Sequence, residues 1–411
     1  MTRFESWTDW FLRAVVGCLI LTCVSAAQTN LEPPQSTIPD AFFGMHIHGI
    51  AVPRPYTGKL TAWPSVKVGS WRLLDAYVKW SDLEPQPGKW EFQRLDKYVD
   101  VAQQHSVDIL LPLLGSPDWA SAGKGKDAGI APPKNMEDWR VFVRTVATRY
   151  KGRIHTYEIW NEPNWPTMWS GTTQQLLDLT REAYVILKQV DPSIAVVSPS
   201  ATTSKGVSWL DGFLRLGGGR YVDMIGFHLY VYPSPPEALI PLARQIESVM
   251  HQYGIGNKPL WDTEVGWVTP KPMPSDEVAA GFIMRAQIVA WAAGISRQYW
   301  YSWDNHNYAL QVVDSQDEHP TAAGQAYAQV EQWLAGGRMT SCRSNNGVWV
   351  VDLFTADRNH PSKIVWSEAP APRSFHLPDD WRVSAFTDFR GEEHPVKGRT
   401  LEIGPVPLLV Q

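Results

Sequence analysis

The sequence predicts an α/β protein, a (β/α)8 TIM barrel followed by a small antiparallel β domain. Two observations support this prediction. Short apolar segments alternate with segments whose apolar residues recur at helical spacing, and eight such units favour closure of a parallel sheet into a barrel. From about residue 337 the pattern changes to strand-like segments separated by Gly, Pro and Asp, which indicates an antiparallel sheet.

The chain has 411 residues, which suits a barrel of roughly 250–300 residues with an appended domain. The expected barrel strands are residues 42–47, 69–74, 107–114, 154–160, 194–198, 222–229, 260–264 and 296–303. The expected helices are residues 92–105, 136–150, 174–189, 238–253, 277–293 and 321–334. The C-terminal strands are expected at 348–354, 363–366, 381–386 and 406–410.

The N-terminal segment has the features of an export signal. Arg13 precedes an apolar run over residues 14–24, and Ser25-Ala26-Ala27 offers small residues for cleavage. We therefore expect a secreted or periplasmic protein in which Cys342 is the one cysteine left after cleavage. A loose lipoprotein box ending at Cys18 leaves open whether the segment is cleaved or kept as an anchor. The expected regions are a signal peptide (1–27), a linker or arm (28–39), the catalytic barrel (40–336) and a β-sandwich-like domain (337–411).

Two carboxylates follow two of the predicted strands. The strand over residues 154–160 ends in Asn161-Glu162-Pro163, and Pro cannot extend a sheet because it lacks a backbone N–H. The strand over residues 260–264 ends in Glu264. Because the carboxyl ends of barrel strands share one rim, these side chains can meet there. Such a pair predicts glycoside hydrolysis, which with retention needs two carboxyl groups about 5–5.5 Å apart and no metal or organic cofactor.

The residues around both carboxylates resemble a known group of enzymes. Ile159-Trp160-Asn161-Glu162-Pro163-Asn164 and Thr263-Glu264-Val265-Gly266 are similar to the two signatures of the clan A glycoside hydrolases, which are (β/α)8 barrels. Within the clan the chain resembles family 39, which comprises β-xylosidases, α-L-iduronidases and exopolysaccharide hydrolases. The resemblance covers about residues 42–303, and the following β domain also suits that family.

The resemblance implies a role for each matching residue. Glu162 would be the general acid/base and Glu264 the nucleophile of a retaining enzyme, with Asn161 on the sugar 2-hydroxyl. Arg72 would lower the pKa of the nucleophile, and we expect partial burial and the neighbouring negative charge to raise the pKa of Glu162. The other implied sugar-binding residues are His228, Tyr230, Trp300, Trp119, His46 and His48.

Two further carboxylates compete for the catalytic roles. Glu158 should lie deeper in the barrel than Glu162, and Asp262 stands short of its strand's end. We therefore expect both to support the site without reaching the sugar.

Parts of the sequence are also compatible with other functions. His46, His48, His228 and Asp304 resemble ligands of a metal-dependent amidohydrolase barrel, although no His follows strand five and no Lys ends strand four. A catalytically silent carbohydrate-binding barrel is the second alternative, and a transglycosidase would use the same two carboxylates. Metal analysis, turnover of an aryl glycoside and product analysis with an acceptor sugar distinguish these possibilities.

The net charge of -5 indicates neither a nucleic-acid-binding surface nor a basic membrane-binding patch. The expected partner is an oligo- or polysaccharide. The sequence leaves open the sugar, exo or endo action and the oligomeric state.

Overall fold

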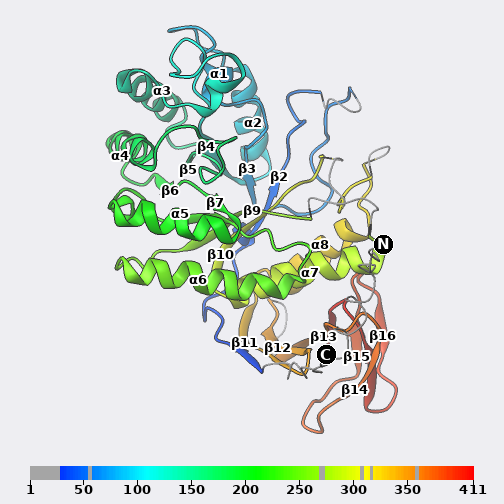
Figure 1. Ribbon diagram of the computed structural model, residues 1–411. Coiled ribbons are helices and arrows are strands. Elements are labelled where there is room, and N and C mark those ends of the chain that lie inside the picture. Colours follow the sequence, from blue (N-terminus) through cyan, green and yellow to red (C-terminus); the bar gives the residue numbers. More distant parts are fainter. Residues whose placement is uncertain (1–27, 54–57, 268–273, 306–309, 315–317, 357–360) are drawn as a thin grey trace, which may run out of the picture.

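The computed structural model describes residues 28–53, 58–267, 274–305, 310–314, 318–356 and 361–411, so the expected signal peptide lies outside the described residues. Its centre is a parallel sheet in the order β6-β5-β4-β3-β2-β10-β9-β8-β7, curled with helices outside it (Figure 1). The strands are β2 (Phe43–His46), β3 (Ser70–Arg72), β4 (Asp108–Leu113), β5 (Thr156–Ile159), β6 (Ala195–Val197), β7 (Ala201–Thr202), β8 (Ile225–His228), β9 (Leu260–Val265) and β10 (Ile295–Trp300).

The predicted fifth strand, residues 194–198, corresponds to β6, and the residues that follow it add the short strand β7. These two strands stand at opposite ends of the strand order. β6 pairs with β5, and β7 pairs with β8. At the break, Val197 forms a bridge to Met224 beside β8, and Ser200 forms a bridge to Asn161 beside β5. One segment therefore touches both edges of the sheet, and the predicted (β/α)8 barrel is confirmed.

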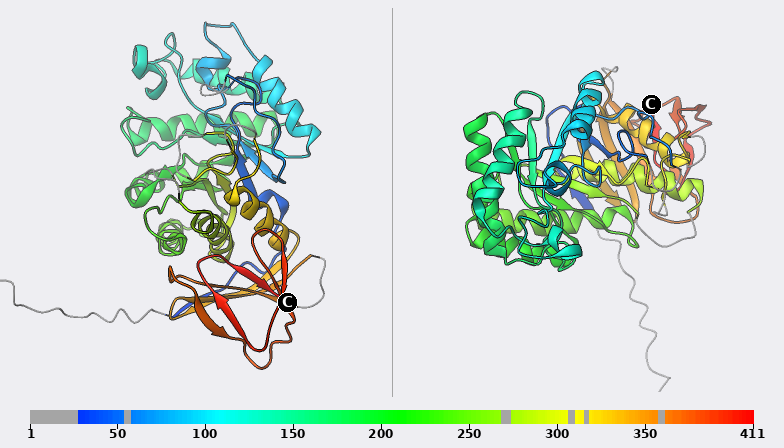
Figure 2. Two further views of the ribbon diagram at one scale, coloured as in Figure 1. Left: turned by 90° about the vertical axis from the view of Figure 1, so that its right-hand side faces the viewer. Right: turned by 90° about the horizontal axis from the view of Figure 1, so that it is seen from above.

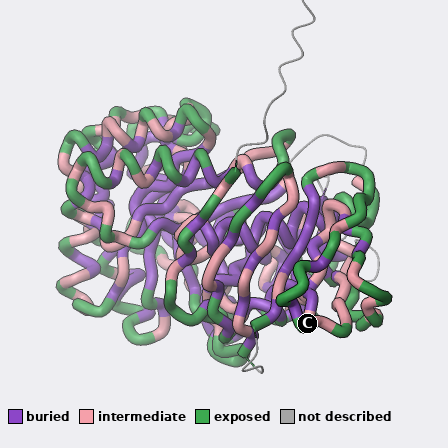
Figure 3. The backbone as a smooth tube through the Cα atoms, turned by 90° about the horizontal axis from the view of Figure 1, so that it is seen from below, coloured by how far each residue is buried: buried purple, intermediate pink, exposed green. Residues whose placement is uncertain are grey.

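The helices cover the outer face of this sheet, and the buried residues concentrate in the strands and on the inward sides of the helices (Figure 3). The α-helices are α1 (Trp80–Leu83), α2 (Gln93–Gln104), α3 (Met136–Arg149), α4 (Thr173–Val190), α5 (Thr203–Arg215), α6 (Leu239–Gln252), α7 (Asp276–Ala292) and α8 (Ala322–Leu334). Short 3-10 helices are η1 (Asp40–Phe42), η2 (Gly125–Ile130), η3 (Gly218–Tyr221) and η4 (Pro236–Ala238). Within the described part of the chain, no helix is both long enough and apolar enough to cross a membrane.

Helix α5 was missing from the sequence prediction. Gly206 and Gly212 weaken its helical pattern, since each Gly costs about 1 kcal/mol relative to Ala in a helix. Gly206 permits close packing, because a Cβ there would lie 2.9 Å from the ring of Phe227 on β8. Tertiary packing thus compensates for a poor local preference.

Helix α7 is buried along its whole length after the first turn, which an amphipathic barrel helix would not be. Its second face lies against the C-terminal strands, which stand at one side of the barrel (Figure 2). At this contact Arg285 of α7 forms a buried ion pair with Glu237 of η4, and Trp366 donates its indole N–H to the same carboxylate at 2.9 Å.

The C-terminal region forms a seven-stranded sheet in the order β1-β11-β12-β13-β18-β15-β16, with a separate β14-β17 pair. Residues of the expected linker or arm supply β1, which pairs antiparallel with β11. The bounds are β1 (Thr29–Leu31), β11 (Arg338–Asn345), β12 (Val348–Phe354), β13 (Pro361–Ser367), β14 (Arg373–His376), β15 (Ala385–Thr387), β16 (Glu393–Pro395), β17 (Thr400–Ile403) and β18 (Leu408–Val410).

Candidate active site

Glu162 is held at the barrel rim by the segment that follows β6. Its backbone N–H donates to the carbonyl of Ser200 at 2.8 Å, and Asn164 exchanges two hydrogen bonds with the backbone of Thr202, at 2.9 and 3.1 Å. Trp160 and Glu162 have φ values of 71° and 46°, a left-handed conformation that costs free energy for such side chains. The chain therefore leaves β5 in a sharp, strongly anchored turn that presents Glu162 at the rim.

Arg72, at the end of β3, is the centre of a buried ionic network. Its Nε and Nη2 atoms donate to the two oxygens of Glu158 at 2.6 and 3.1 Å. Its Nη1 donates to Glu264 Oε2 at 2.8 Å, and Nη2 also donates to Asn161 Oδ1 at 2.7 Å. The Arg72 and Glu158 side chains are fully buried, so this cation is balanced by carboxylates and its donors are satisfied.

Glu264, on β9, is fixed through both of its oxygens. Arg72 binds Oε2, and the Tyr230 hydroxyl donates to Oε1 at 2.8 Å. One oxygen each of Glu162 and Glu264 lie within 4.8 Å of one another, together with a ring nitrogen of His228. The structure thus brings together the two carboxylates that the sequence analysis placed at one rim.

His228, at the end of β8, couples the two carboxylates electrostatically. Its Nδ1 lies 3.0 Å from Glu162 Oε1. Burial lowers the pKa of His228, but the charge of Glu264 and the contact with Glu162 outweigh that effect, and the pKa lies above its usual value.

The pKa of Glu162 differs from the sequence-based expectation. Burial would raise it, but the hydrogen bond and charge of His228, together with Arg72, hold the pKa below its usual value. The predicted elevation of the Glu162 pKa is therefore wrong for the unliganded site. Burial raises the pKa of Glu264 and Glu162 adds to this effect, even though His228 and Arg72 oppose it.

Both competing carboxylates are buried away from the rim. Glu158 binds Arg72, as described above. Asp262 accepts the backbone N–H of Leu229 at 3.0 Å and the Gln298 amide at 3.1 Å. Burial raises the pKa of Asp262 to about 7, because those two hydrogen bonds only partly offset the loss of water.

The remaining predicted sugar-binding residues occupy different environments. His46 is fully buried with Nε2 3.1 Å from the Thr263 carbonyl, whereas His48 pairs with Asp304 at 3.2 Å and lines a cavity. Trp119 is partly buried and donates its indole N–H to the Glu84 carbonyl at 3.0 Å. Trp300 is 1% exposed. The sugar contacts assigned to these four residues stay predictions.

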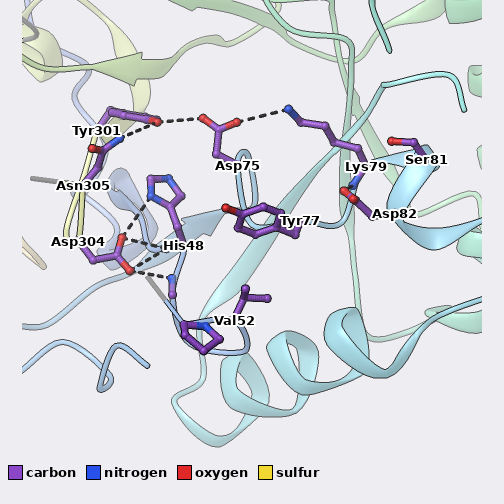
Figure 4. Close-up of a pocket in the computed structure, with 12 residues that line it drawn as sticks. His48, Val52, Asp75, Tyr77, Lys79, Ser81, Asp82, Tyr301, Asp304 and Asn305 are labelled. Carbon is purple, nitrogen blue, oxygen red and sulfur yellow. Dashed lines mark hydrogen bonds and ion pairs between the residues drawn. The ribbon is translucent and has the colours of Figure 1, made fainter. Parts of the chain in front are cut away.

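Two adjoining cavities open at this rim. The catalytic cavity, of about 300 Å³, is lined by Glu162, Glu264 and Asn161 among others. The second cavity, of about 350 Å³, includes His48, Tyr77 and Asp304 in its wall (Figure 4). The two share four lining residues, which are Asp75, Lys79, Ser81 and Tyr301.

The sequence analysis did not predict that Asp75, Tyr77, Lys79, Ser81 and Asp82 line a cavity at this rim. They directly follow the predicted strand over residues 69–74, so their position at a strand's carboxyl end was the available signal. The left-handed φ of 56° at both Asp75 and Tyr77 could not be read from residue type, because neither is Gly.

Two groups among the described residues bring three potential metal-ligand atoms within 4.8 Å of one another. One comprises Glu162, His228 and Glu264, and the other is Asp388, Glu392 and His394 in the C-terminal sheet. The ligand set of the amidohydrolase alternative, His46, His48, His228 and Asp304, does not assemble in the part of the chain that the structure describes.

Sequence comparisons match the chain to glycosyl hydrolases. Residues 134–327 match the family model "Glycosyl hydrolase catalytic core", and residues 74–187 match "Glycosyl hydrolase family 10". A β-xylosidase of Geobacillus stearothermophilus is 24% identical over 187 residues, which is 38% of this chain and 36% of that relative. The chain thus matches about a third of the length of this curated relative.

Solved structures share the fold over most of the chain. A family 39 glycoside hydrolase from Bacteroides cellulosilyticus superimposes with a TM-score of 0.72 at 17% identity, covering 84% of this chain and 75% of that one. A family 39 β-xylosidase from Caulobacter crescentus gives a TM-score of 0.65 at 14% identity, covering 93% and 97%. Together with the sequence matches, these neighbours show that the chain is similar to glycosyl hydrolases and shares the fold of family 39 enzymes.

Proposed function

We propose that the protein is a retaining glycosidase, with Glu264 as nucleophile and Glu162 as general acid/base. The observation that supports this most directly is the separation of the carboxylates, whose nearest oxygens lie within 4.8 Å of each other. Retaining enzymes place the two carboxyl groups about 5–5.5 Å apart, whereas inverting enzymes need about 6.5–9.5 Å to hold a water between nucleophile and sugar.

The contacts of Glu264 suit a nucleophile. Arg72 and Tyr230 each donate to one of its oxygens, so the carboxylate is oriented and both contacts oppose the rise in its pKa that burial causes. In the first step Glu264 attacks the anomeric carbon and the bond to the leaving oxygen breaks. The result is a covalent glycosyl-enzyme, which water later hydrolyses.

The leaving group needs a proton, and the Glu162–His228 pair can store it. In the unliganded site the high pKa of His228 and the low pKa of Glu162 favour imidazolium beside carboxylate. The 3.0 Å contact lets Nδ1 return the proton to Glu162 as the leaving oxygen takes one from that carboxyl group. Glu162, ionised again, then activates the water of the second step.

Asn161 is oriented by the same network. Its Oδ1 accepts from Arg72 at 2.7 Å, so its NH2 group is the end left to donate to the sugar 2-hydroxyl. That hydrogen bond strengthens as positive charge develops on the ring, and it therefore contributes to the rate rather than to ground-state binding alone.

A screen of 4-nitrophenyl glycosides tests the proposal, starting with β-xylosides because two of the relatives above are β-xylosidases. Glu264→Gln should abolish turnover. Glu162→Ala should slow the hydrolysis of substrates with poor leaving groups most, and azide should restore its rate by forming a glycosyl azide of retained configuration.

Glu91→Gln, a change at a carboxylate outside the catalytic cavity, is the matched control and should retain activity. Inverted product, or a Glu162→Ala variant insensitive to both azide and leaving group, would refute the assignment.

A further inference from the structure

We propose that the second cavity is a sugar subsite on the glycone side of the cleavage point, where a neutral ring stacks on Tyr77. This inference rests on the proposed glycosidase function. The cavity adjoins the catalytic cavity through a shared wall and has a volume of about 350 Å³, so one cleft offers room for a sugar beyond the one being cleaved.

The position of the second cavity assigns it to the glycone side. Glu162 protonates the leaving oxygen, so the leaving group lies toward Glu162 at the end of β5. The second cavity is lined by residues that follow β2, β3 and β10, and β2 stands three strands from β5 in the sheet order. Glu162 is absent from its lining, so the cavity extends away from the leaving group.

Tyr77 is built as a platform in this cavity. It is 43% exposed, whereas the expected platform Trp300 is 1% exposed. Arg94 donates to the Tyr77 carbonyl at 2.6 Å, and its guanidinium lies 5.7 Å from the ring centroid. These contacts hold Tyr77 at a φ of 56°, an unfavourable conformation that persists only where the surroundings impose it. Its hydroxyl end points to the side where His48 and Asp304 lie (Figure 4).

The charged residues that the structure describes in this cavity favour a neutral sugar. Lys79 faces Asp75 at 3.4 Å, and His48 faces Asp304 at 3.2 Å, so among the described lining residues each cation already has a carboxylate partner. Asp82 adds a further carboxylate and accepts the backbone N–H of Lys79 at 3.0 Å. A uronic acid would require an unmatched cation, whereas sugar hydroxyls can donate to these carboxylates.

Asp75 is suited to accept such hydroxyls. Its carboxylate also accepts the Tyr301 hydroxyl at 2.9 Å, which fixes its orientation toward the shared wall. Burial would raise the pKa of Asp75, but Lys79 and His48 keep it below its usual value, so the group is an acceptor throughout the neutral pH range.

A substrate with two glycone rings follows from this assignment. The enzyme should prefer 4-nitrophenyl β-xylobioside to 4-nitrophenyl β-xyloside in kcat/KM, or the corresponding pair of whichever neutral sugar the screen identifies. Loss of one aromatic stacking contact is expected to reduce that preference about 3–10-fold in Tyr77→Ala. Tyr77→Phe and Tyr77→Trp should keep the preference. Val141→Ala, which changes an exposed apolar side chain on the outer face of α3, is the control and should also keep it.

Each outcome of this experiment decides something. Turnover with equal kcat/KM for the two substrates, or a preference unchanged in Tyr77→Ala, would refute the subsite while leaving the glycosidase intact. A preference for a 4-nitrophenyl disaccharide whose outer ring is glucuronic acid would refute the neutral specificity. Failure of every aryl glycoside would overturn both the function and the subsite.

Discussion

Two groups of charged residues in the cleft differ in how firmly they are held. Arg72, which binds the catalytic-cavity residues Glu264 and Asn161, is completely buried together with Glu158, to which it donates two hydrogen bonds, and Glu264 is nearly buried. In the wall that the two cavities share, the side chains of Lys79 and Asp75 are 40% and 45% exposed and meet at 3.4 Å. The buried network fixes atoms for bond breaking, whereas the exposed pair can adapt to a bound sugar.

The difference has an energetic basis. A buried charge that loses its partner strongly destabilises the folded state, because water cannot solvate it. Substitution of one member of the buried network should therefore greatly lower the free energy of unfolding. An exposed pair contributes about 0–1 kcal/mol and is screened by salt. Substitutions in the buried network and in the exposed pair should therefore have effects of very different size.

The largest effect is expected from Arg72→Gln. It leaves Glu158 buried without its cation and should lower the free energy of unfolding by about 3–5 kcal/mol. It should also reduce kcat by more than about a hundredfold, because Glu264 and Asn161 both lose an orienting donor. Denaturant unfolding and steady-state kinetics measure the two effects.

Arg149→Gln is the control for that comparison. Arg149 forms a two-point ion pair with Asp96, at 2.6 and 3.0 Å, but its side chain is 44% exposed. Its loss should cost about 1 kcal/mol or less. If the two variants lost similar stability, burial would not be what distinguishes the catalytic network.

His228→Gln should give the next largest effect, which is seen in the pH profile. In the wild type the proton for the leaving group is stored on the Glu162–His228 pair and is lost only above the usual His pKa of about 6.5, because the pKa of His228 is raised. Without the imidazole, Glu162 must hold that proton as a carboxylic acid. The alkaline limb of kcat/KM should therefore move to lower pH. An alkaline limb that stayed in place would exclude His228 as the proton store.

Asp262→Asn should change stability rather than chemistry. The folded pKa of Asp262 is raised to about 7, above an unfolded value of about 3.9, so the folded state holds an extra proton between these limits. Its stability should therefore fall as pH rises from about 4 to 7, by on the order of 1–4 kcal/mol. Asn removes this dependence while its amide can still bond Leu229 and Gln298. Equal pH dependence of Tm in both proteins would contradict this account.

Lys79→Met should give the smallest effect. The exposed pair with Asp75 is expected to contribute less than about 1 kcal/mol to the free energy of unfolding. Thermal unfolding at low and high salt measures this contribution, which should shrink as salt is added. A loss as large as that of Arg72→Gln would show that the exposed pair is as tightly coupled as the buried network.

The sequence predicted the parts of the molecule that depend on local pattern. The alternation of strands and helices, and the Asn161-Glu162-Pro163 turn, are local features, and the barrel rim brings Glu162 and Glu264 together because strand ends share one face. Helix α5 was missed because its stability comes from packing against β8 rather than from its own residues.

Features that depend on contacts between distant parts of the chain could not be predicted from the sequence. The pKa of Glu162 depends on His228, which is 66 residues away in the chain. No local sequence pattern indicates which ring nitrogen of the imidazole contacts the carboxyl group. The exposure of Tyr77 depends on a backbone conformation that residue type disfavours. The sequence shows that Trp300 and Tyr77 are both aromatic. It does not show that the Trp300 ring is buried and the Tyr77 ring exposed, because that difference arises from packing.

The pairing of β1 with β11 has a consequence for how the protein matures. The strand at Thr29–Leu31 finds its partner in Arg338–Asn345, so on the ribosome its edge stays unprotected until nearly the whole polypeptide has been synthesised. The C-terminal sheet can therefore form only late in synthesis. A truncated translation product would expose an unpaired strand edge to chaperones and proteases.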